Sequence, residues 1–202
     1  TPSVVTVIVL PGGDVVERSG VSAEEAVTLA GGTALSWIHV DGLGDSHVVE
    51  FLMKAFSLHP LAVEDTMNPH QRPKLDDYGE SLFLSLRLPG SACVDETAGQ
   101  LSLFVLKNTV ISFREGGNPC PVQAVRERLR KGAFNERVRA SGSDFLAYSL
   151  LDAVVDYFYV ALEQAGERLE ALENEVLTAA SPAVVSEIRT AKRDLLSLRR
   201  SV

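Results

Sequence analysis

Two periodicities of apolar residues alternate along the first 135 residues. Continuous or alternating runs of β-branched and apolar residues predict strands at residues 4–10, 34–40, 81–88, 100–108 and 109–115. Apolar residues at helical spacing predict helices at residues 22–29, 46–56, 60–67 and 121–131. The order begins strand, helix, strand, and the later strands follow one another closely. This pattern predicts an α/β fold with a mixed parallel and antiparallel sheet flanked by helices, an α/β/α sandwich.

The last third of the chain has a longer apolar repeat. Its apolar positions are spaced close to 3.67 residues per turn, at Leu150, Val154, Phe158, Ala161, Ala165, Leu169, Leu172 and Val176. This spacing predicts one helix over residues 144–178, about 50 Å long at 1.5 Å per residue. A helix of that length extends beyond the body of a small domain.

Ser181 and Pro182 are typical of a helix start, so a second helix is predicted immediately after the first. The short link predicts an antiparallel hairpin. Folding about residue 181 pairs an acidic arm with a basic one, at Glu173–Arg189, Glu170–Lys192 and Glu163–Arg199. We therefore expect two units, an α/β domain at residues 1–135 and long helices at residues 143–202.

Composition narrows the class of protein. The chain has 202 residues, 46% of them hydrophobic, and a formal net charge of −8. Such a charge argues against a nucleic-acid binder, which needs clustered Lys and Arg. Cys93 and Cys120 are far apart, which indicates neither a disulfide scaffold nor a zinc ribbon and favours a reducing compartment. No run of 18 apolar residues predicts a membrane span, and the unbroken helical pattern near Val202 predicts a piece of a longer protein.

No motif in the sequence indicates catalysis. A P-loop, a GxSxG turn and an HExxH pair are all missing, and none of the four histidines has a second one at helical spacing. His59 precedes Pro60 and is best interpreted as a helix entry. We therefore predict that the chain is not an enzyme.

Two adjacent carboxylates stand out at Glu64 and Asp65. The helical spacing places Asp65 on the same face as Ala62, so its charge should point partly toward packed surface and needs a partner. One interpretation is an ion pair with Arg72 or Lys74 just downstream, which composition alone favours. The other is a site for a hard divalent cation, since magnesium typically takes one or two protein carboxylates.

A second acidic pair, Asp152 and Asp156, lies one helical turn apart in the most apolar part of the long helix. Like charges at this spacing repel weakly. A solvated edge of an amphipathic helix is the simpler interpretation, and a second cation site is the alternative.

Several segments together resemble the cytoplasmic domain of CorA-type magnesium transporters. They are Trp37-Ile38, "HPLAVED" (59–65), "RPK" (72–74), Tyr78, "VISFRE" (110–115) and "YSLLDAVVDYF" (148–158). The resemblance implies a homopentameric channel-like transporter on the cytoplasmic face of the inner membrane. It also implies that Mg²⁺ bound between neighbouring subunits holds the funnel closed, with Asp65 and Glu64 in one regulatory site and Asp156 in a second.

The chain departs from that family in several ways. It lacks the transmembrane helices, the Gly-Met-Asn loop and the stalk helix, so membrane attachment and transport belong to a longer parent protein. The fragment alone is expected to be soluble, and without those anchors a monomer is one of its expected states. Tyr157 stands where the family often has a further acid. Co²⁺ and Ni²⁺ remain alternatives to Mg²⁺. A ZntB-like zinc transporter and a soluble scaffold presenting a helical hairpin are the competing functions.

Overall fold

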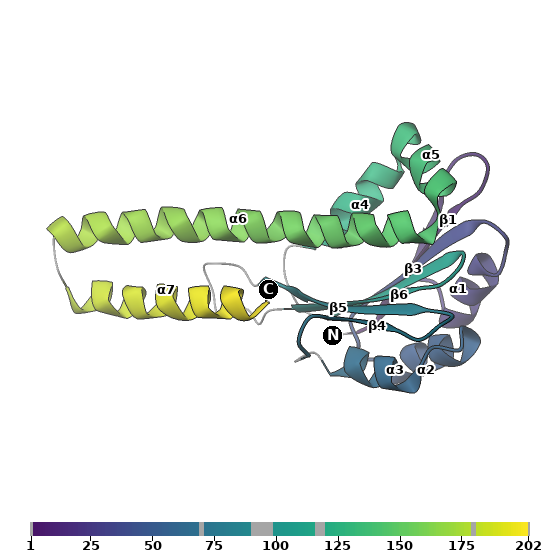
Figure 1. Cartoon of the computed structure of the whole chain (residues 1–202), viewed down its shortest axis with the longest axis horizontal. Coiled ribbons are helices and arrows are strands. Elements are labelled where there is room, and N and C mark those ends of the chain that lie inside the picture. Colours follow the sequence, from purple (N-terminus) through teal and green to yellow (C-terminus); the bar gives the residue numbers. More distant parts are fainter. Residues whose placement is uncertain (1, 69–70, 90–98, 116–119, 179–180, 202) are drawn as a thin grey trace.

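The computed structural model describes residues 2–68, 71–89, 99–115, 120–178 and 181–201. Its strands are β1 (Val4–Leu10), β2 (Val16–Ser19), β3 (Leu35–Asp41), β4 (Lys74–Asp77), β5 (Leu82–Leu88), β6 (Gly99–Val105) and β7 (Thr109–Glu115). Its helices are α1 (Ala23–Ala30), α2 (Ser46–Ala55), α3 (Pro60–Met67), α4 (Pro121–Leu129), α5 (Gly132–Ser141), α6 (Ser143–Thr178) and α7 (Pro182–Ser201). Within the described residues these elements form a three-layer body from which a helical hairpin projects (Figure 1).

The strands form one mixed sheet in the order β2-β1-β3-β7-β6-β5-β4. The central pair, β3 and β7, is parallel, with Trp37 opposite Val110 and Ile38 opposite Ile111. The other described neighbours are antiparallel. β3, β6 and β7 are buried over most of their length because helices cover both faces of the sheet, which explains their nearly continuous apolar sequences.

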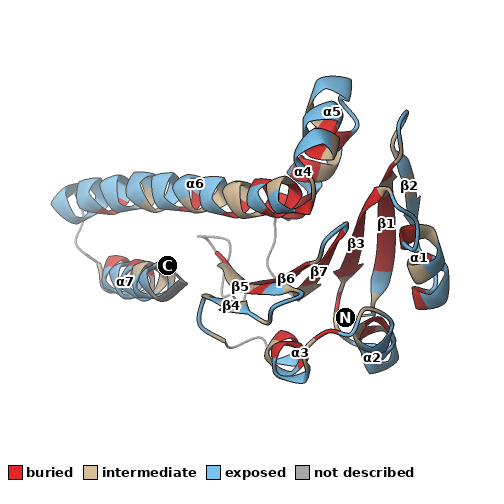
Figure 2. Ribbon diagram, turned by 45° about the vertical axis from the view of Figure 1, so that its right-hand side comes forward, coloured by how far each residue is buried: buried red, intermediate tan, exposed pale blue. Residues whose placement is uncertain are grey.

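Alternate strand residues point into two separate cores, because successive side chains of a strand face opposite sides. One core lies under α1, α2 and α3 and includes Ile38, Phe83, Phe104 and Phe113. The other lies under α4, α5 and α6 and includes Trp37 with buried residues of β6 and β7. Figure 2 shows the buried residues concentrated on the strands and on the helix faces turned toward them. The predicted α/β/α sandwich is confirmed.

The helical hairpin is also confirmed. α6 begins after Gly142, whose φ of 85° lies in the left-handed region that glycine adopts without strain. Its first half packs on the sheet through buried Leu146, Leu150 and Val154, and its second half extends away from the body (Figure 1). α7 then returns antiparallel, with the Ser181 hydroxyl accepting a hydrogen bond from the backbone N–H of Val184 at 3.4 Å.

The apolar character of α6 has a structural explanation. Among the described residues, α6 is the helix long and apolar enough to cross a membrane by length and composition alone. Its buried residues in the first half supply much of the core beneath α4 and α5. The core helix of a folded protein can have the same length and composition, so these two properties alone are weak evidence that α6 spans a membrane.

Three elements were not predicted: β2, β4 and α5. β2 and β4 form the two edges of the sheet and consist mainly of polar residues, so their apolar alternation is weak. α5 is largely polar and covers the body through a few side chains, with Val138 buried. The other predicted helices and strands are present, most with bounds shifted by one to three residues.

Candidate functional site

α3 carries Asp65 and is held at its beginning by local interactions. Pro60 occupies the first helical turn, and the Nδ1 atom of His59 accepts a hydrogen bond from the backbone N–H of Leu61 at 3.3 Å. The His59 ring stacks on Tyr78, with centroids 4.1 Å apart. The predicted helix-entry role of His59 is therefore confirmed, and the stack joins the start of α3 to the end of β4.

β4 places a lysine directly against Asp65. The Lys74 Nζ atom lies 2.6 Å from a carboxylate oxygen of Asp65 and 2.9 Å from one of Asp76. Because Lys74 and Asp76 are two residues apart on a strand, both face α3. Of the two ion-pair partners considered from the sequence, the structure shows Lys74. The Asp65 side chain is only 17% exposed, which agrees with its predicted position toward packed surface.

Asp65 is also held through its main chain. Gln100, which is buried in β6, donates a hydrogen bond from Nε2 to the backbone carbonyl of Asp65 at 3.0 Å and another to the hydroxyl of Ser102 at 3.1 Å. A carbonyl oxygen can only accept a hydrogen bond, so the side-chain NH₂ group of Gln100, and not its oxygen, faces Asp65. The last turn of α3 is thereby anchored to the centre of the sheet.

The carboxylates line an open hollow of about 440 Å³ between α3 and β4, with Leu61, Glu64, Asp65, Lys74, Asp76, Asp77 and Tyr78 around it. Glu64 is exposed and makes no ion pair within the described part of the chain. Hydrogen bonds from the ammonium to Asp65 and Asp76 raise the pKa of Lys74 above its ordinary value, so it stays charged. The hollow therefore brings four carboxylates near one permanent positive charge.

The donor set suits a hard cation. The Lys74 ammonium stands where oxygens of two carboxylates converge, and it occupies the position of a cation there. Carboxylate oxygens are the ligands that Mg²⁺ prefers. Among the described residues, however, no group of three His, Cys, Asp or Glu side chains is arranged to hold a metal ion. A divalent cation in this hollow would keep several waters or take further ligands from another chain.

Asp156 lies in a different part of the molecule. It is on α6, on the opposite face of the sheet from α3 (Figure 1), so the structure does not bring it together with Glu64 and Asp65. Asp156 is exposed and Asp152 is half-buried, and neither makes an ion pair with another described residue. This placement agrees with a solvated helix edge and leaves a cation site at Asp156 as a prediction.

A buried polar group that sequence reasoning missed lies beneath α4. The Trp37 indole N–H donates to the hydroxyl of Ser112 at 2.8 Å, and the Nδ1 atom of His39 is also 2.8 Å from that hydroxyl. Burial lowers the pKa of His39 to about 4, and the neighbouring charge of Asp41 opposes this shift. Asp41 itself forms a bidentate pair with Arg114, at 2.8 and 3.0 Å.

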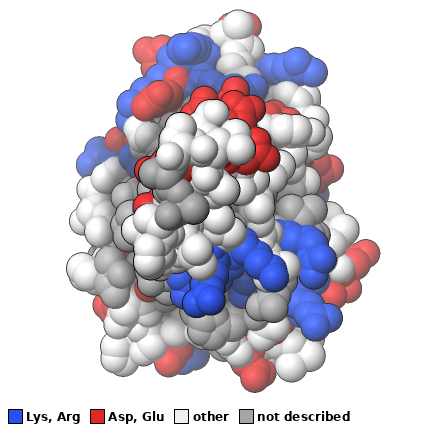
Figure 3. Space-filling model, turned by 90° about the vertical axis from the view of Figure 1, so that its left-hand side faces the viewer, with Lys and Arg blue, Asp and Glu red and all other residues white. Residues whose placement is uncertain are grey.

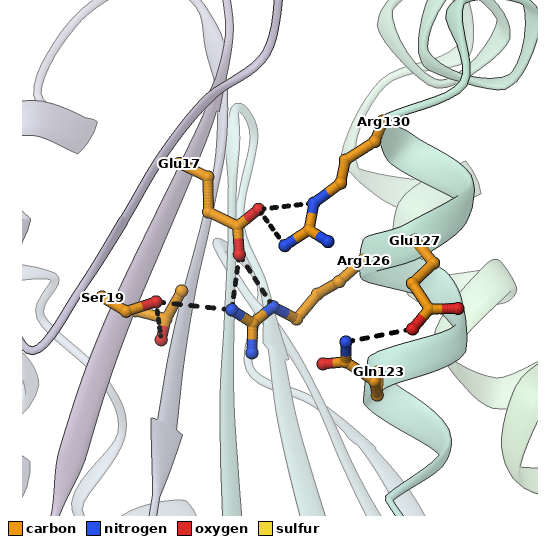
Figure 4. Close-up of polar contacts among 7 residues, drawn as sticks. Glu17, Ser19, Gln123, Arg126, Glu127 and Arg130 are labelled. Carbon is orange, nitrogen blue, oxygen red and sulfur yellow. Dashed lines mark hydrogen bonds and ion pairs between the residues drawn. The ribbon is translucent and has the colours of Figure 1, made fainter.

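A second ionic cluster joins β2 to α4. One oxygen of Glu17 accepts from Arg126 and the other accepts from Arg130, the latter at 2.8 Å (Figure 4). Burial raises the pKa of Glu17, but the hydrogen bonds and charges of Arg126 and Arg130 together bring it below its ordinary value. Arg126 also donates to the hydroxyl of Ser19 at 3.3 Å. This cluster ties an edge strand to a helix, and its two guanidinium groups share the one carboxylate of Glu17.

The charges of the hairpin are distributed unevenly. On the end of the molecule that the hairpin forms, acidic and basic side chains gather in separate areas (Figure 3). The distal half of α6 contributes exposed acids at Glu163, Glu167, Glu170, Glu173 and Glu175, and α7 contributes exposed bases at Arg189, Lys192, Arg193 and Arg199. Arg168 on α6 and Asp194 on α7 form an ion pair between the two helices, at 3.1 Å.

The family model and the curated relatives that match this chain are all described as metal ion transporters. Residues 32–202 match the family described as CorA-like Mg²⁺ transporter protein. The cobalt/magnesium transport protein CorA of Thermotoga maritima is 34% identical over 170 residues, which cover 83% of this chain and 47% of that protein. A putative metal ion transporter of Bacillus subtilis is 26% identical over 169 residues. The chain spans about half the length of these curated relatives.

Solved structures show the same fold. The soluble domain of CorA from Methanocaldococcus jannaschii superposes with a TM-score of 0.73 at 14% identity, covering 98% of this chain and 74% of that one. The ZntB cytoplasmic domain from Vibrio parahaemolyticus gives a TM-score of 0.64 at 12% identity, covering 99% and 75%. At these identities the likeness concerns the fold alone.

Proposed function

The chain belongs to the CorA-like Mg²⁺ transporter family, and we propose that it is the cytoplasmic, divalent-cation-sensing part of a homopentameric magnesium transporter. In this proposal, membrane attachment at the inner membrane and the transport pathway lie in the longer protein. The part described here performs no covalent chemistry. It responds to the cytoplasmic concentration of Mg²⁺ and so controls the opening of the pore.

The observation that carries the proposal is the convergence of carboxylates in the hollow between α3 and β4. Asp65 and Asp76 already hold one cation, the Lys74 ammonium, and Glu64 lies exposed at the same hollow. If Asp65 and Glu64 face a neighbouring subunit, their bare charges repel that subunit's acids, and a bound divalent cation removes the repulsion. A cation that binds only this closed arrangement stabilises it by mass action.

Asp156 is proposed as part of a second cation site on α6. Its exposed position makes it available to a neighbouring subunit, and the chain offers no internal partner for it among the described residues. Tyr157 next to it leaves this site with fewer acids than the family pattern has. The support is therefore weaker than at Asp65.

A ZntB-like zinc transporter is the first alternative. It shares the fold, but the ligands gathered at Asp65 are carboxylate oxygens, whereas protein zinc sites draw on His and Cys. A soluble scaffold is the second alternative, and the projecting hairpin fits it. The scaffold gives no account of the convergent carboxylates.

The test is Asp65→Asn in the full-length protein, with Mg²⁺-dependent protection of the pentamer against protease as the readout. Loss of one charged ligand should raise the Mg²⁺ concentration for half-maximal protection by about tenfold or more. Asp14→Asn, an exposed aspartate in the turn before β2, is the matched control and should leave that concentration unchanged. Equal protection of Asp65→Asn and the unmodified protein would count against the sensing role.

A further inference from the structure

The Lys74 ammonium occupies the place that a divalent cation would need. It bridges Asp65 and Asp76 at 2.6 and 2.9 Å, which are the distances of charge-assisted hydrogen bonds. A divalent ion coordinated by the same oxygens cannot share that position with the ammonium because of both space and like charge. Cation binding and the Lys74 ion pairs therefore exclude each other at these carboxylates.

The main chain that carries Asp65 is held in place, so α3 cannot shift to bring its carboxylate to another position. Gln100 holds the Asp65 carbonyl at 3.0 Å, and the start of α3 is fixed by the His59–Tyr78 stack. Lys74, in contrast, has a long side chain that is 34% exposed, with its ammonium 5.7 Å from the centre of the Phe83 ring. When a second cation enters, Lys74 is the group able to move, and it can extend into solvent.

We propose that Lys74 is a tethered competitor that sets the Mg²⁺ concentration at which the Asp65 site responds. The proposal rests on the cation-sensing function given above and adds the regulation of that site. At low Mg²⁺ the ammonium offsets part of the negative charge of Asp65 and Asp76 within one subunit. At high Mg²⁺ the divalent ion displaces it, and the displaced lysine returns to water.

The competition has a definite thermodynamic consequence. Each favourable contact that Lys74 makes with the two carboxylates must be given up before the divalent ion binds, so it weakens the apparent affinity for Mg²⁺. The coupling is reciprocal, because the ion loosens Lys74 by the same factor. A site with no internal cation would remain filled at lower Mg²⁺ and would respond over a lower range of concentrations.

The experiment compares Lys74→Gln, Lys74→Arg and Asp65→Asn in the full-length protein. The readout is again the Mg²⁺ concentration for half-maximal protection, with chymotrypsin as the protease because these substitutions neither create nor remove its preferred aromatic sites. Lys74→Gln removes the competing charge and should lower that concentration by about fivefold or more. Lys54→Gln at an exposed lysine of α2, a helix on this side of the sheet, is the control for the change in net charge.

Lys74→Arg keeps the charge and offers a guanidinium that can hold both carboxylates, so its half-protection concentration should be equal to or above that of the unmodified protein. This variant keeps the test valid if Lys74→Gln fails to fold, since a lower concentration with Arg would overturn the proposal. An unchanged or raised concentration with Gln would also overturn it.

The Asp65→Asn variant distinguishes the role of Lys74 from the site itself. If Asp65→Asn still raises the concentration when the Lys74 variants contradict the proposal, the sensing function stands and only the role of Lys74 is wrong. If Asp65→Asn has no effect, the site itself is wrong.

Discussion

Asp65 is a side chain for which the sequence allowed two interpretations, a structural ion pair and a ligand-binding role. Its ion pair with Lys74 is the simpler of the two interpretations that the sequence allowed, and the structure confirms it. The sequence did not reveal Asp76, because "KLDD" (74–77) was not recognised as a strand. Once it is a strand, the two-residue period places Lys74 and Asp76 on one face, and the three-residue cluster follows.

His39 raises a different question at the residue scale, which is how a titratable group is kept inside the core. It is 3% exposed, and it hydrogen-bonds Ser112 beside the Trp37 indole. The sequence showed a histidine in a buried strand but not its partner, because Ser112 is 73 residues away and is brought close by the parallel pairing of β3 and β7. Long-range pairing of this kind has no local sequence signal.

We expect His39 to make the protein less stable in weak acid. Its pKa is lowered to about 4 in the folded protein, from an ordinary value of 6.5. Between these values the unfolded chain binds a proton that the folded chain does not, so the free energy of unfolding decreases as the pH falls from 6.5 to 4. The decrease in unfolding free energy that is due to His39 amounts to about 2 to 3 kcal/mol by pH 4. It should be absent in His39→Asn.

The measurement is urea unfolding at pH 7.5 and pH 4.5 for both proteins. The quantity compared is the difference in unfolding free energy between the two pH values, so a general loss of stability in the variant does not affect the result. His47→Asn, at an exposed histidine of α2, controls for the change of residue type. An identical pH dependence in His39→Asn and the unmodified protein would show that His39 is not the group responsible.

At the scale of elements, the hairpin tests the pairing that the sequence suggested. The predicted pairs, such as Glu170–Lys192, have residue numbers that add to 362, and so does the observed pair Arg168–Asp194. The register is therefore as predicted. The three predicted ion pairs are not formed among the described residues, and their members are exposed on α6 and α7. The observed pair has the opposite arrangement of charges, with the base on α6 and the acid on α7.

A double-mutant cycle should detect the observed pair and not the predicted one. With side chains 25% and 35% exposed, Arg168 and Asp194 should couple by about 0.3 to 1 kcal/mol when both are replaced by alanine. The Glu170–Lys192 cycle is the matched control, at the same register, and should give a coupling near zero. Thermal unfolding of the single and double variants supplies both values. A larger coupling for Glu170–Lys192 would mean that the hairpin is rotated in solution.

The elements that sequence reasoning missed share a physical cause. β2 is stabilised by pairing with β1 and by the Glu17 cluster with α4, and not by a hydrophobic alternation of its own. α5 depends on α4 and α6, with Arg128 over the Phe134 ring at 4.2 Å. Strands and helices with strong internal periodicity were found correctly, whereas those whose stability comes from tertiary contacts give little local signal.

At the scale of the whole molecule, three apolar clusters differ greatly in size. Two large cores lie on the two faces of the sheet, while among the described residues the cluster of the distal hairpin consists of Leu172, Val184 and Ala191. Exposed apolar side chains lie along α6, among them Leu177 at 83% near its end and Tyr159 at 70% near its middle. The predicted division at residues 135–143 stays a prediction, since the first half of α6 belongs to the body through its packing.

This difference in burial should appear as a difference in local stability. Backbone amides in the distal half of α6 and in α7 should exchange with solvent much faster than those in β3, β6 and β7, because opening the hairpin exposes few apolar contacts. Hydrogen exchange followed by mass spectrometry measures both regions in one experiment. Leu172→Ala should accelerate exchange in the hairpin and leave the central strands unchanged, and Leu103→Ala in β6 should have its largest effect on the strands. Uniform protection across the two regions would mean that the hairpin is stabilised by contacts with another chain, as an oligomeric transporter would provide.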